Sequence, residues 1–214
     1  MNREHFEHVK KAIEGKSSLL IVSKYHSIDE VMEYYGLGLR HFGENRMQEL
    51  LPKAASLPKD IHWHFLGHLQ KDKVKKVVPV VSMIQSLDSK ELAEKIEQVC
   101  AKNEIIMPCL IELHLAEDEG KKTGIPKEDL IPLMDFCQTL PHLDVQGIMV
   151  MGPNVEDEEK IRSTFQEGHQ IFLDLQKRYG PEKIRIYSAG MSHDFEIALE
   201  EGANQVRIGS YLFA

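Results

Sequence analysis

Residues 19–42 read LLIVSKYHSIDEVMEYYGLGLRHF, and this stretch holds one full repeat of the pattern that decides the fold. An apolar run, Leu19–Ser23, is followed by a helical pattern that begins with a capping box, Ser27–Glu30, and stops at Gly36. A second apolar run, Leu39–Phe42, comes next. The order predicts a strand, a helix and another strand, which is the βα unit of parallel-sheet proteins.

The same alternation continues through the rest of the chain. The apolar runs that predict its eight strands are Leu19–Ser23, Leu39–Phe42, Ile61–Leu66, Met83–Ser86, Ile105–Leu113, Asp144–Val150, Lys183–Tyr187 and Gln205–Ile208. Helical patterns between them open at Asp88 and Glu91, cover Leu130–Cys137 and Ile161–Leu175, and finish with a helix over about Ser192–Glu201. Eight such units in 214 residues predict an α/β fold, a (β/α)8 TIM-type barrel, with an open doubly wound sheet as the alternative.

Residues of reactive or phosphate-binding types follow nearly every predicted strand, and this favours the barrel. They are Lys24, Glu44, Asn45, Gly67, His68, Ser86, Asn154, Ser188–Ser192, Gly209 and Ser210. In a barrel, the carboxyl ends of all eight strands meet at one mouth. No change of composition marks a linker, so we predict that residues 1–214 form a single domain, with an N-terminal helix over about Arg3–Glu14.

The overall charge argues against two classes of partner. The chain has 26 Lys and Arg residues against 34 Asp and Glu residues, a net charge of -8. Nucleic acids and acidic membranes are bound by concentrated positive charge, so we expect neither as a partner. No window approaches the roughly 18 apolar residues of a membrane helix, and the first residues lack the apolar core of a secretory signal. We therefore expect a cytoplasmic protein, and a monomer because no large apolar stripe is evident.

Cysteine and histidine spacing gives little support for a metal site. Cys100, Cys109 and Cys137 form no CxxC pair, which indicates reduced, buried thiols rather than a disulfide or zinc framework. His62, His64 and His68 have a spacing that zinc sites use, but neither a carboxylate nor a cysteine completes the set. We predict no metal.

Two features could carry chemistry at the predicted mouth. Lys24 ends the first strand behind apolar residues that would desolvate its amine, and a neutral amine can attack an aldehyde. After the last two strands come Ser188–Ser192 and Arg207–Ser210, where small residues, hydroxyls and backbone N–H groups describe a phosphate cup. Alternatively, the glycines there only make turns and Ser192 only caps a helix. A lysine and a phosphate cup together suit pyridoxal phosphate, which carries an aldehyde and a phosphate.

Six ordered motifs carry a more specific signal over about residues 19 to 213. They are Ile21-Val22-Ser23-Lys24, His41-Phe42-Gly43-Glu44-Asn45, Trp63-His64-Phe65-Leu66-Gly67-His68-Leu69-Gln70, Gly147-Ile148-Met149-Val150-Met151, Ser188-Ala189-Gly190-Met191-Ser192 and Val206-Arg207-Ile208-Gly209-Ser210. With these motifs the chain closely resembles the pyridoxal phosphate homeostasis protein family, which is similar to the N-terminal barrel domain of alanine racemases. The resemblance implies a fold-type III barrel that binds pyridoxal 5'-phosphate and acts in vitamin B6 and amino-acid homeostasis.

The resemblance also implies roles for individual residues. Lys24 holds the cofactor as an internal aldimine, Asn45 lies near its ring and O3′, and Arg207 faces its pyridine nitrogen. The residues implied to line the phosphate are Ser188, Gly190, Ser192, Gly209 and Ser210. Met151 reads first as barrel packing and secondly as a contact to the ring. The resemblance implies no role for His193.

Two arguments favour a cofactor holder over an enzyme, so we predict no catalytic residue. An arginine is a permanent cation without an acceptor, so it would leave the ring nitrogen unprotonated and weaken the ring as an electron sink. The racemases also complete their site with a second domain and a tyrosine base, for which eight βα units leave no room. The alternatives are a small amino-acid racemase that uses Lys24 as base and a phosphate-binding barrel enzyme of sugar or nucleotide metabolism.

Several lysines are candidates for transfer of the cofactor to pyridoxal phosphate-dependent enzymes, which would be transient partners. Lys71, Lys73, Lys75 and Lys76 read first as the solvated side of a helix. Lys121 and Lys122 fall in a predicted loop after the fifth strand, from which they could reach the mouth.

Overall fold

Eight parallel strands close into a barrel in the computed structural model, which describes residues 1–115 and 123–214. The strands are β1 Ser18–Val22, β2 His41–Glu44, β3 His62–Phe65, β4 Met83–Leu87, β5 Met107–Leu113, β6 Leu143–Val150, β7 Ile186–Ser188 and β8 Gln205–Ile208. β1 pairs with β2 on one side and with β8 on the other, where Ile21 lies opposite Ile208. The barrel prediction is confirmed, and the open-sheet alternative is wrong because the first and last strands are paired.

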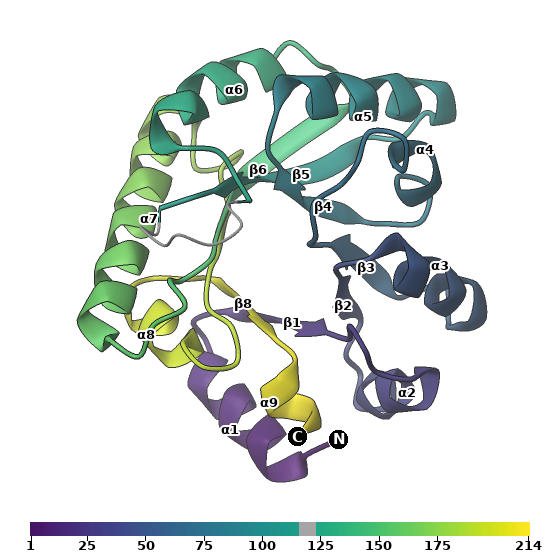
Figure 1. Cartoon of the computed structure of the whole chain (residues 1–214), viewed down its shortest axis with the longest axis vertical. Coiled ribbons are helices and arrows are strands. Elements are labelled where there is room, and N and C mark those ends of the chain that lie inside the picture. The colour runs from purple at the N-terminus through teal and green to yellow at the C-terminus, as the bar shows by residue number, and fades with distance from the viewer. Residues whose placement is uncertain (116–122) are drawn as a thin grey trace.

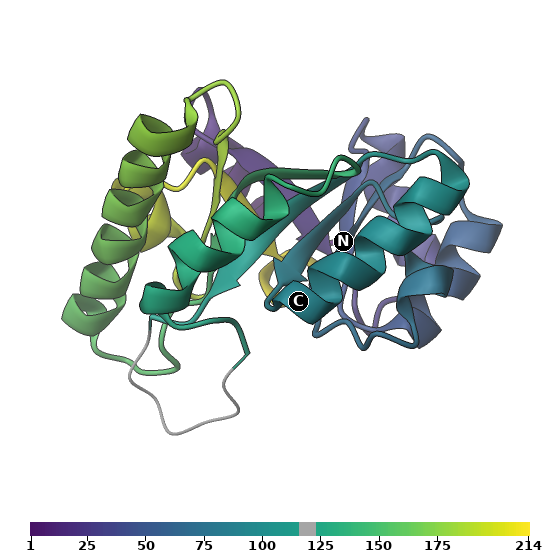
Figure 2. The ribbon, with the colours of Figure 1, turned by 90° about the horizontal axis from the view of Figure 1, so that it is seen from above.

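Helices surround the strands on the outside of the ring (Figure 1). They are α1 Arg3–Ile13, α2 Ile28–Gly36, α3 Met47–Ser56, α4 Val74–Val77, α5 Lys90–Asn103, α6 Leu130–Cys137, α7 Glu158–Tyr179, α8 Phe195–Glu200 and α9 Ser210–Phe213, with a 3-10 turn, η1 Lys127–Asp129, before α6. Figures 1 and 2 both place the two chain ends side by side. There the Asn2 side-chain amide donates to the carbonyl of Ala214 at 3.0 Å.

Side-chain caps fix the starts of α1, α2, α5 and α7. The predicted capping box of α2 is present, with Ser27 Oγ accepting from the N–H of Glu30 and the Glu30 carboxylate accepting from the N–H of Ser27. Asp157 caps α7, in the acidic stretch where a carboxylate favours a helix N-terminus. The helix expected to open at Asp88 is instead capped by Ser89, whose hydroxyl accepts from Leu92 N–H.

Three strands and one helix begin at least two residues later than their apolar patterns predict. β5 begins at Met107 rather than Ile105, because the N–H of Ile105 bonds back to Cys100 at the end of α5. β2 begins at His41 rather than Leu39, because the N–H of Leu39 bonds back to Tyr34 and extends the end of α2. β7 begins at Ile186 rather than Lys183, because the preceding residues turn back onto Gly180. α8 begins at Phe195 rather than Ser192, and the difference changes the role of Ser192 at the mouth.

The apolar core lies mostly between the strands and the helices, whereas the barrel interior is largely polar. A small apolar cluster of Met83, Leu110 and Met149 fills one part of the interior. Beside it, buried polar side chains link β3, β4, β7 and β8 by hydrogen bonds through His64, Gln85, Ser188, Gln205 and Arg207. This polar interior positions the floor of the site at the mouth.

The helices in the described part of the chain include none that is both long enough and apolar enough to cross a lipid bilayer.

Candidate functional site

A cavity of about 200 Å³ lies at the mouth formed by the carboxyl ends of the strands. Its lining residues are Val22, Lys24, Asn45, Leu66, Met149, Met151, Met191, Ser192, His193, Arg207, Gly209 and Ser210. Seven of these were singled out in the sequence as cofactor-binding candidates: Lys24, Asn45, Met151, Ser192, Arg207, Gly209 and Ser210. They lie at or just beyond the carboxyl ends of β1, β2, β6 and β8, in the segment between β7 and α8 and at the start of α9, so only closure of the barrel brings them together.

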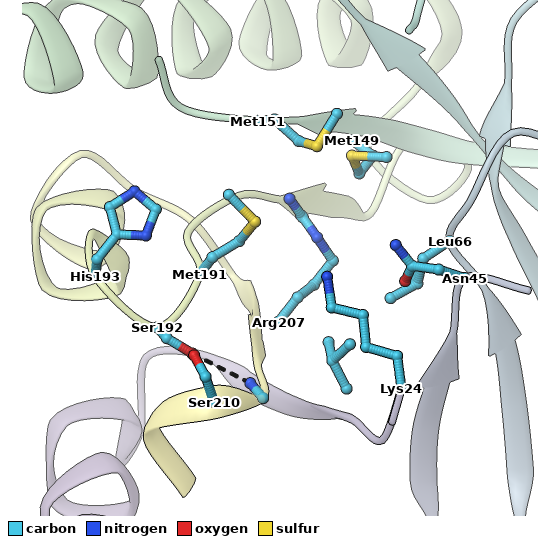
Figure 3. A pocket seen from close by; sticks show the side chains of 12 residues that line it. Lys24, Asn45, Leu66, Met149, Met151, Met191, Ser192, His193, Arg207 and Ser210 are labelled. Carbon is cyan, nitrogen blue, oxygen red and sulfur yellow. Dashed lines mark hydrogen bonds between the residues drawn. The ribbon is translucent and has the colours of Figure 1, made fainter. Parts of the chain in front are cut away.

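Lys24 stands two residues beyond β1 and extends into the cavity toward Arg207, with Asn45 and Leu66 beside it (Figure 3). The sequence predicted that apolar neighbours would desolvate this amine. The structure differs, because the chain leaves the barrel after Val22 and Lys24 is an exposed residue. Its amine is therefore accessible from solvent at the open side of the mouth.

Ser192 and Ser210 lie on one side of the cavity, opposite Met149 and Met151 in Figure 3, and Gly209, next to Ser210 in the chain, also lines the cavity. Ser192 does not cap α8, which was the alternative to the phosphate cup. Its Oγ instead accepts from the N–H of Gly209 at 3.3 Å and the N–H of Tyr211 at 3.2 Å. The hydroxyl thereby ties the segment before α8 to the start of α9 and keeps its own proton available for a ligand.

The same side of the cavity offers hydrogen-bond donors that the protein itself does not use. Within residues 1–115 and 123–214, no group accepts a hydrogen bond from the backbone N–H of Ser192, His193 or Ser210. Three free N–H groups and two hydroxyls, next to the cations of Lys24 and Arg207, are a donor set that fits an anion such as a phosphate ester. This cluster of N–H and hydroxyl donors lies where the sequence predicted the phosphate cup.

Arg207 forms the floor of the cavity and is held in place by two hydrogen bonds. Its guanidinium donates to Ser188 Oγ at 2.8 Å and to the carbonyl of Val150 at 2.9 Å. Burial lowers the pKa of Arg207 to about 10, while the nearby carboxylates of Asp194 and Glu112 act in the opposite direction. The side chain therefore remains a cation at neutral pH and presents donors, not acceptors, to the cavity.

Ser188 and Gly190, both predicted to contact a phosphate, lie behind the cavity wall rather than in it. Ser188 is fully buried, and its Oγ donates to Gln85 at 2.8 Å while accepting from Arg207. Gly190 has φ +89°, and a Cβ there would come within 2.6 Å of the Ala198 side chain. Ser188 thus supports Arg207, and Gly190 lets the loop pass close to α8.

Several lining residues received no role, or only a packing role, from the sequence. Leu66, Met149 and Met191 lie within the quoted motifs and add an apolar surface to the polar one. His193 lines the cavity with its side chain half-exposed, and its Nε2 lies 3.5 Å from the buried carboxylate of Asp194. Of these residues, only His193 had no sequence signal that set it apart.

Besides Asp194, two further acidic side chains near the mouth are buried. Glu44, at the end of β2, is fully buried and accepts hydrogen bonds from Ser23 and Lys53, and burial raises its pKa against the effect of those partners. Burial likewise raises the pKa of Glu112 on β5, and a hydrogen bond to Thr123 opposes the shift. Neither residue lines the cavity, so the mouth itself is lined by cations and neutral donors.

The remaining sequence candidates lie away from the cavity or outside the described residues. His64 is buried inside the barrel and bonds to His41 and Gln85, and His68 pairs with Asp88. No group of three potential metal ligands occurs in the described ranges. Lys121 and Lys122 fall in residues 116–122, which are not described. The three cysteines are buried and unpaired, as predicted.

Comparison with known proteins identifies the family. The family model of the alanine racemase N-terminal domain matches residues 2–214. The pyridoxal phosphate homeostasis protein of Aquifex aeolicus is 40% identical over 201 residues, which cover 94% of this chain and 87% of that protein. This chain belongs to the pyridoxal phosphate homeostasis protein family. The family resemblance predicted from the six motifs is confirmed.

Solved structures agree with this assignment. PipY of Synechococcus elongatus, solved without pyridoxal phosphate, superposes with a TM-score of 0.92 at 30% identity, and 99% of each chain is covered. The structure of PipY with pyridoxal phosphate bound gives a TM-score of 0.89 at 29% identity, again with 99% of each chain covered. An alanine racemase of Clostridium difficile shares the fold, with a TM-score of 0.82 at 14% identity, and this chain covers 56% of it.

Proposed function

We propose that this protein binds pyridoxal 5'-phosphate in the cavity at the barrel mouth and serves pyridoxal phosphate homeostasis. The observation that carries the proposal is the juxtaposition in one cavity of an exposed lysine amine with unused N–H and hydroxyl donors. When bound, this cofactor supplies an aldehyde that condenses with an amine with loss of water, and a pyridine ring that accepts electrons. The family membership and the pyridoxal phosphate bound to PipY support the same ligand.

Each end of the cavity would hold a different part of the ligand. The N–H groups of Ser192, His193 and Ser210, with the two serine hydroxyls, would bind the phosphate. Lys24 would form the covalent bond to the aldehyde carbon, with Asn45 beside the ring on the same side of the cavity. Met149 and Met151, across the cavity, would pack against the ring face.

Arg207 supports a holding role rather than strong catalysis. A buried guanidinium that is already fixed by Ser188 and Val150 would donate a hydrogen bond to the pyridine nitrogen and keep it unprotonated. An unprotonated ring is a weaker electron sink, so proton abstraction from a bound amino acid would be slow. The exposed Lys24 would at the same time leave the covalent bond open to exchange with solvent and with incoming amines.

The finer parts of the proposal concern the cell and the molecule as a whole. We propose a cytoplasmic monomer built as one barrel domain, which hands its cofactor to pyridoxal phosphate-dependent enzymes through transient contacts. These statements rest on the composition and on the open mouth of the barrel. Size-exclusion chromatography with light scattering measures the oligomeric state, and a stable dimer would contradict the monomer.

Titration of the purified protein with pyridoxal phosphate tests the central proposal. We expect one equivalent to be bound, with a visible absorption band that is absent in Lys24→Ala and retained in Lys16→Ala, a matched control for the loss of one exposed lysine. A wild-type protein that takes up no cofactor would overturn the proposal. Retention of phosphate esters without any bond to Lys24 would instead favour the phosphate-binding barrel enzyme.

A second measurement separates the holding role from the racemase alternative. Incubation of the loaded protein with alanine in deuterated solvent reports exchange of the α-proton by proton NMR. We expect exchange no faster than that of free pyridoxal phosphate with alanine. Exchange that is much faster and that disappears in Lys24→Ala would support the racemase.

A further inference from the structure

The backbone on both sides of Lys24 is tied to three charged residues, the buried Glu44 and Lys53 and the partly exposed Glu49, which we call the turn cluster. Lys53 lies on α3 and is only 7% exposed, although lysines are rarely buried without a partner. Its Nζ donates to the carbonyl of Ser23 and to Oε1 of Glu44, both at 2.6 Å. The carbonyl that precedes Lys24 is therefore held by an ammonium group.

The amide that follows Lys24 is held by the same cluster. Oε2 of Glu49 accepts from the backbone N–H of Tyr25 at 2.6 Å and lies 3.9 Å from Lys53 Nζ. Tyr25 has φ +68°, a left-handed conformation that is unfavourable for a residue with a side chain. The Tyr25 side chain is 71% exposed, so packing of the ring in the core does not hold this turn. Two hydrogen bonds oppose its relaxation, the one to Glu49 and one from the N–H of His26 to the carbonyl of Ser23 at 3.1 Å.

Burial makes the anchor on Ser23 rigid. Glu44 is fully buried, and its Oε1 accepts from Ser23 Oγ at 2.7 Å as well as from Lys53. If either Glu44 or Lys53 moved away, the other would be left as a buried charge without its partner, which is unfavourable. The cluster therefore fixes Ser23, and with it the direction in which the next residue points.

We propose that Glu49 and Lys53 are positioning residues that hold the turn formed by Lys24 and the left-handed Tyr25, and so aim the Lys24 amine at the aldehyde carbon of the bound cofactor. The proposal rests on the proposed role of Lys24. The covalent step transfers no electrons to or from the cluster: the amine nitrogen bonds to the aldehyde carbon, and the oxygen leaves as water. Neither positioning residue lines the cavity, so neither is expected to contribute to binding of the phosphate or the ring.

A comparison of two ligands separates positioning from binding. Pyridoxine 5'-phosphate has an alcohol in place of the aldehyde, so its affinity reports only the phosphate and ring contacts. The rate at which pyridoxal phosphate bonds to Lys24, followed by stopped-flow absorbance at saturating ligand, reports the orientation of the amine. We expect Glu49→Ala to lower this rate about ten- to a hundredfold, as misplaced groups do, and to leave the affinity for pyridoxine 5'-phosphate within about twofold.

Conservative variants and one control keep the test specific. Glu49→Gln retains an oxygen that can accept from Tyr25 N–H and should restore most of the rate of bonding to Lys24. Lys53→Arg keeps a positive charge and should give a higher rate of bonding than Lys53→Met. Lys59→Met is the matched control, because Lys59 donates to the carbonyls of Ala54 and Ala55 near the end of α3 and does not line the cavity. If Lys53→Met fails to fold, the two Glu49 variants decide the question, since Glu49 is not fully buried.

Amide hydrogen exchange in the protein without cofactor gives an independent readout. The Tyr25 amide should exchange at least about tenfold faster in Glu49→Ala than in the wild type or in Glu49→Gln. A normal bonding rate in Glu49→Ala, or an equal loss of affinity for pyridoxine 5'-phosphate, would overturn the positioning role. If instead the wild type forms no bond to Lys24 at all, the proposed function fails, while the amide exchange still tests the hydrogen bond to Glu49.

Discussion

Ser192→Ala removes a hydroxyl that joins two segments of the mouth and also faces the cavity. The Oγ of Ser192 accepts from the N–H groups of Gly209 and Tyr211 at 3.3 and 3.2 Å, so its loss leaves both donors without that partner. Ser210 is the matched comparison, because it lines the same cavity, is exposed, and makes no side-chain hydrogen bond within the described residues. The two variants should therefore differ in the free energy of unfolding, whereas both should weaken the binding of pyridoxal phosphate.

The magnitudes follow from the hydrogen bonds. Two long N–H to Oγ bonds contribute about 0.5–1 kcal/mol each, so Ser192→Ala should lower the free energy of unfolding by about 1–2 kcal/mol. For a chain of this length that corresponds to a fall in Tm of about 2–8 °C, whereas Ser210→Ala should move the Tm by less than about 2 °C. Loss of a hydrogen bond to a charged phosphate costs about 1.5–3 kcal/mol, so either variant should bind pyridoxal phosphate about 10- to 150-fold more weakly.

Calorimetry and ligand titration measure both effects. Pyridoxal, which lacks the phosphate, is the control ligand, and its affinity should be nearly unchanged in both variants. Ser192→Thr retains the hydroxyl and should recover most of the lost stability and affinity. An equal loss of affinity for pyridoxal and pyridoxal phosphate would refute the phosphate assignment, and an unchanged Tm for Ser192→Ala would refute the bridging role of its Oγ.

Three further predictions concern pH, thiol reactivity and backbone shape. Burial lowers the pKa of His64 to about 3, so below pH 6.5 the unfolded chain binds more protons than the folded one, and stability is lost as the pH falls. Between pH 7 and pH 5, urea unfolding should show a loss of about 2 kcal/mol from this residue that His64→Gln lacks; parallel profiles would contradict it. Burial raises the pKa of Cys100 to about 11 and of Cys137 to about 12, so Ellman's reagent at pH 8 should label no thiol before unfolding, and rapid labelling of the native protein would disprove this. Gly190→Ala should cost about 2 kcal/mol or more, because of its φ of +89° and the close approach of its new Cβ to Ala198, and Ala198→Gly should recover part of the loss; an unaltered Tm would argue against this packing.

The sequence predicted the barrel and the rough position of the site because both leave local patterns. Each strand and helix has its own hydrophobic period, and the phosphate-binding loop is marked by small residues close to one another in the chain. The capping box at Ser27 and Glu30 was read from neighbouring residues alone. The strand ends were less predictable, since turns such as that at Gly180 decide where pairing starts.

The support beneath the site could not be predicted, because it depends on contacts between residues that are far apart in the sequence. The hydrogen bond between Gln85 and Gln205 joins residues 120 positions apart, and that between Lys53 and Ser23 spans 30. The sequence pattern around a single lysine on a helix, such as Lys53, does not show whether its side chain is buried or exposed to solvent. The same reason explains Ser192, which follows β7 and meets its partners at the start of α9 only when β7 pairs with β8.

Reduction of the loaded protein with borohydride, followed by peptide mass mapping, tests the central claim most directly. The account predicts a single pyridoxyl phosphate group fixed to the peptide that contains Lys24, and no modification of that kind in Lys24→Ala. Modification spread over surface lysines such as Lys71 and Lys75, or a Lys24 peptide that remains unmodified while cofactor is bound, would contradict the account.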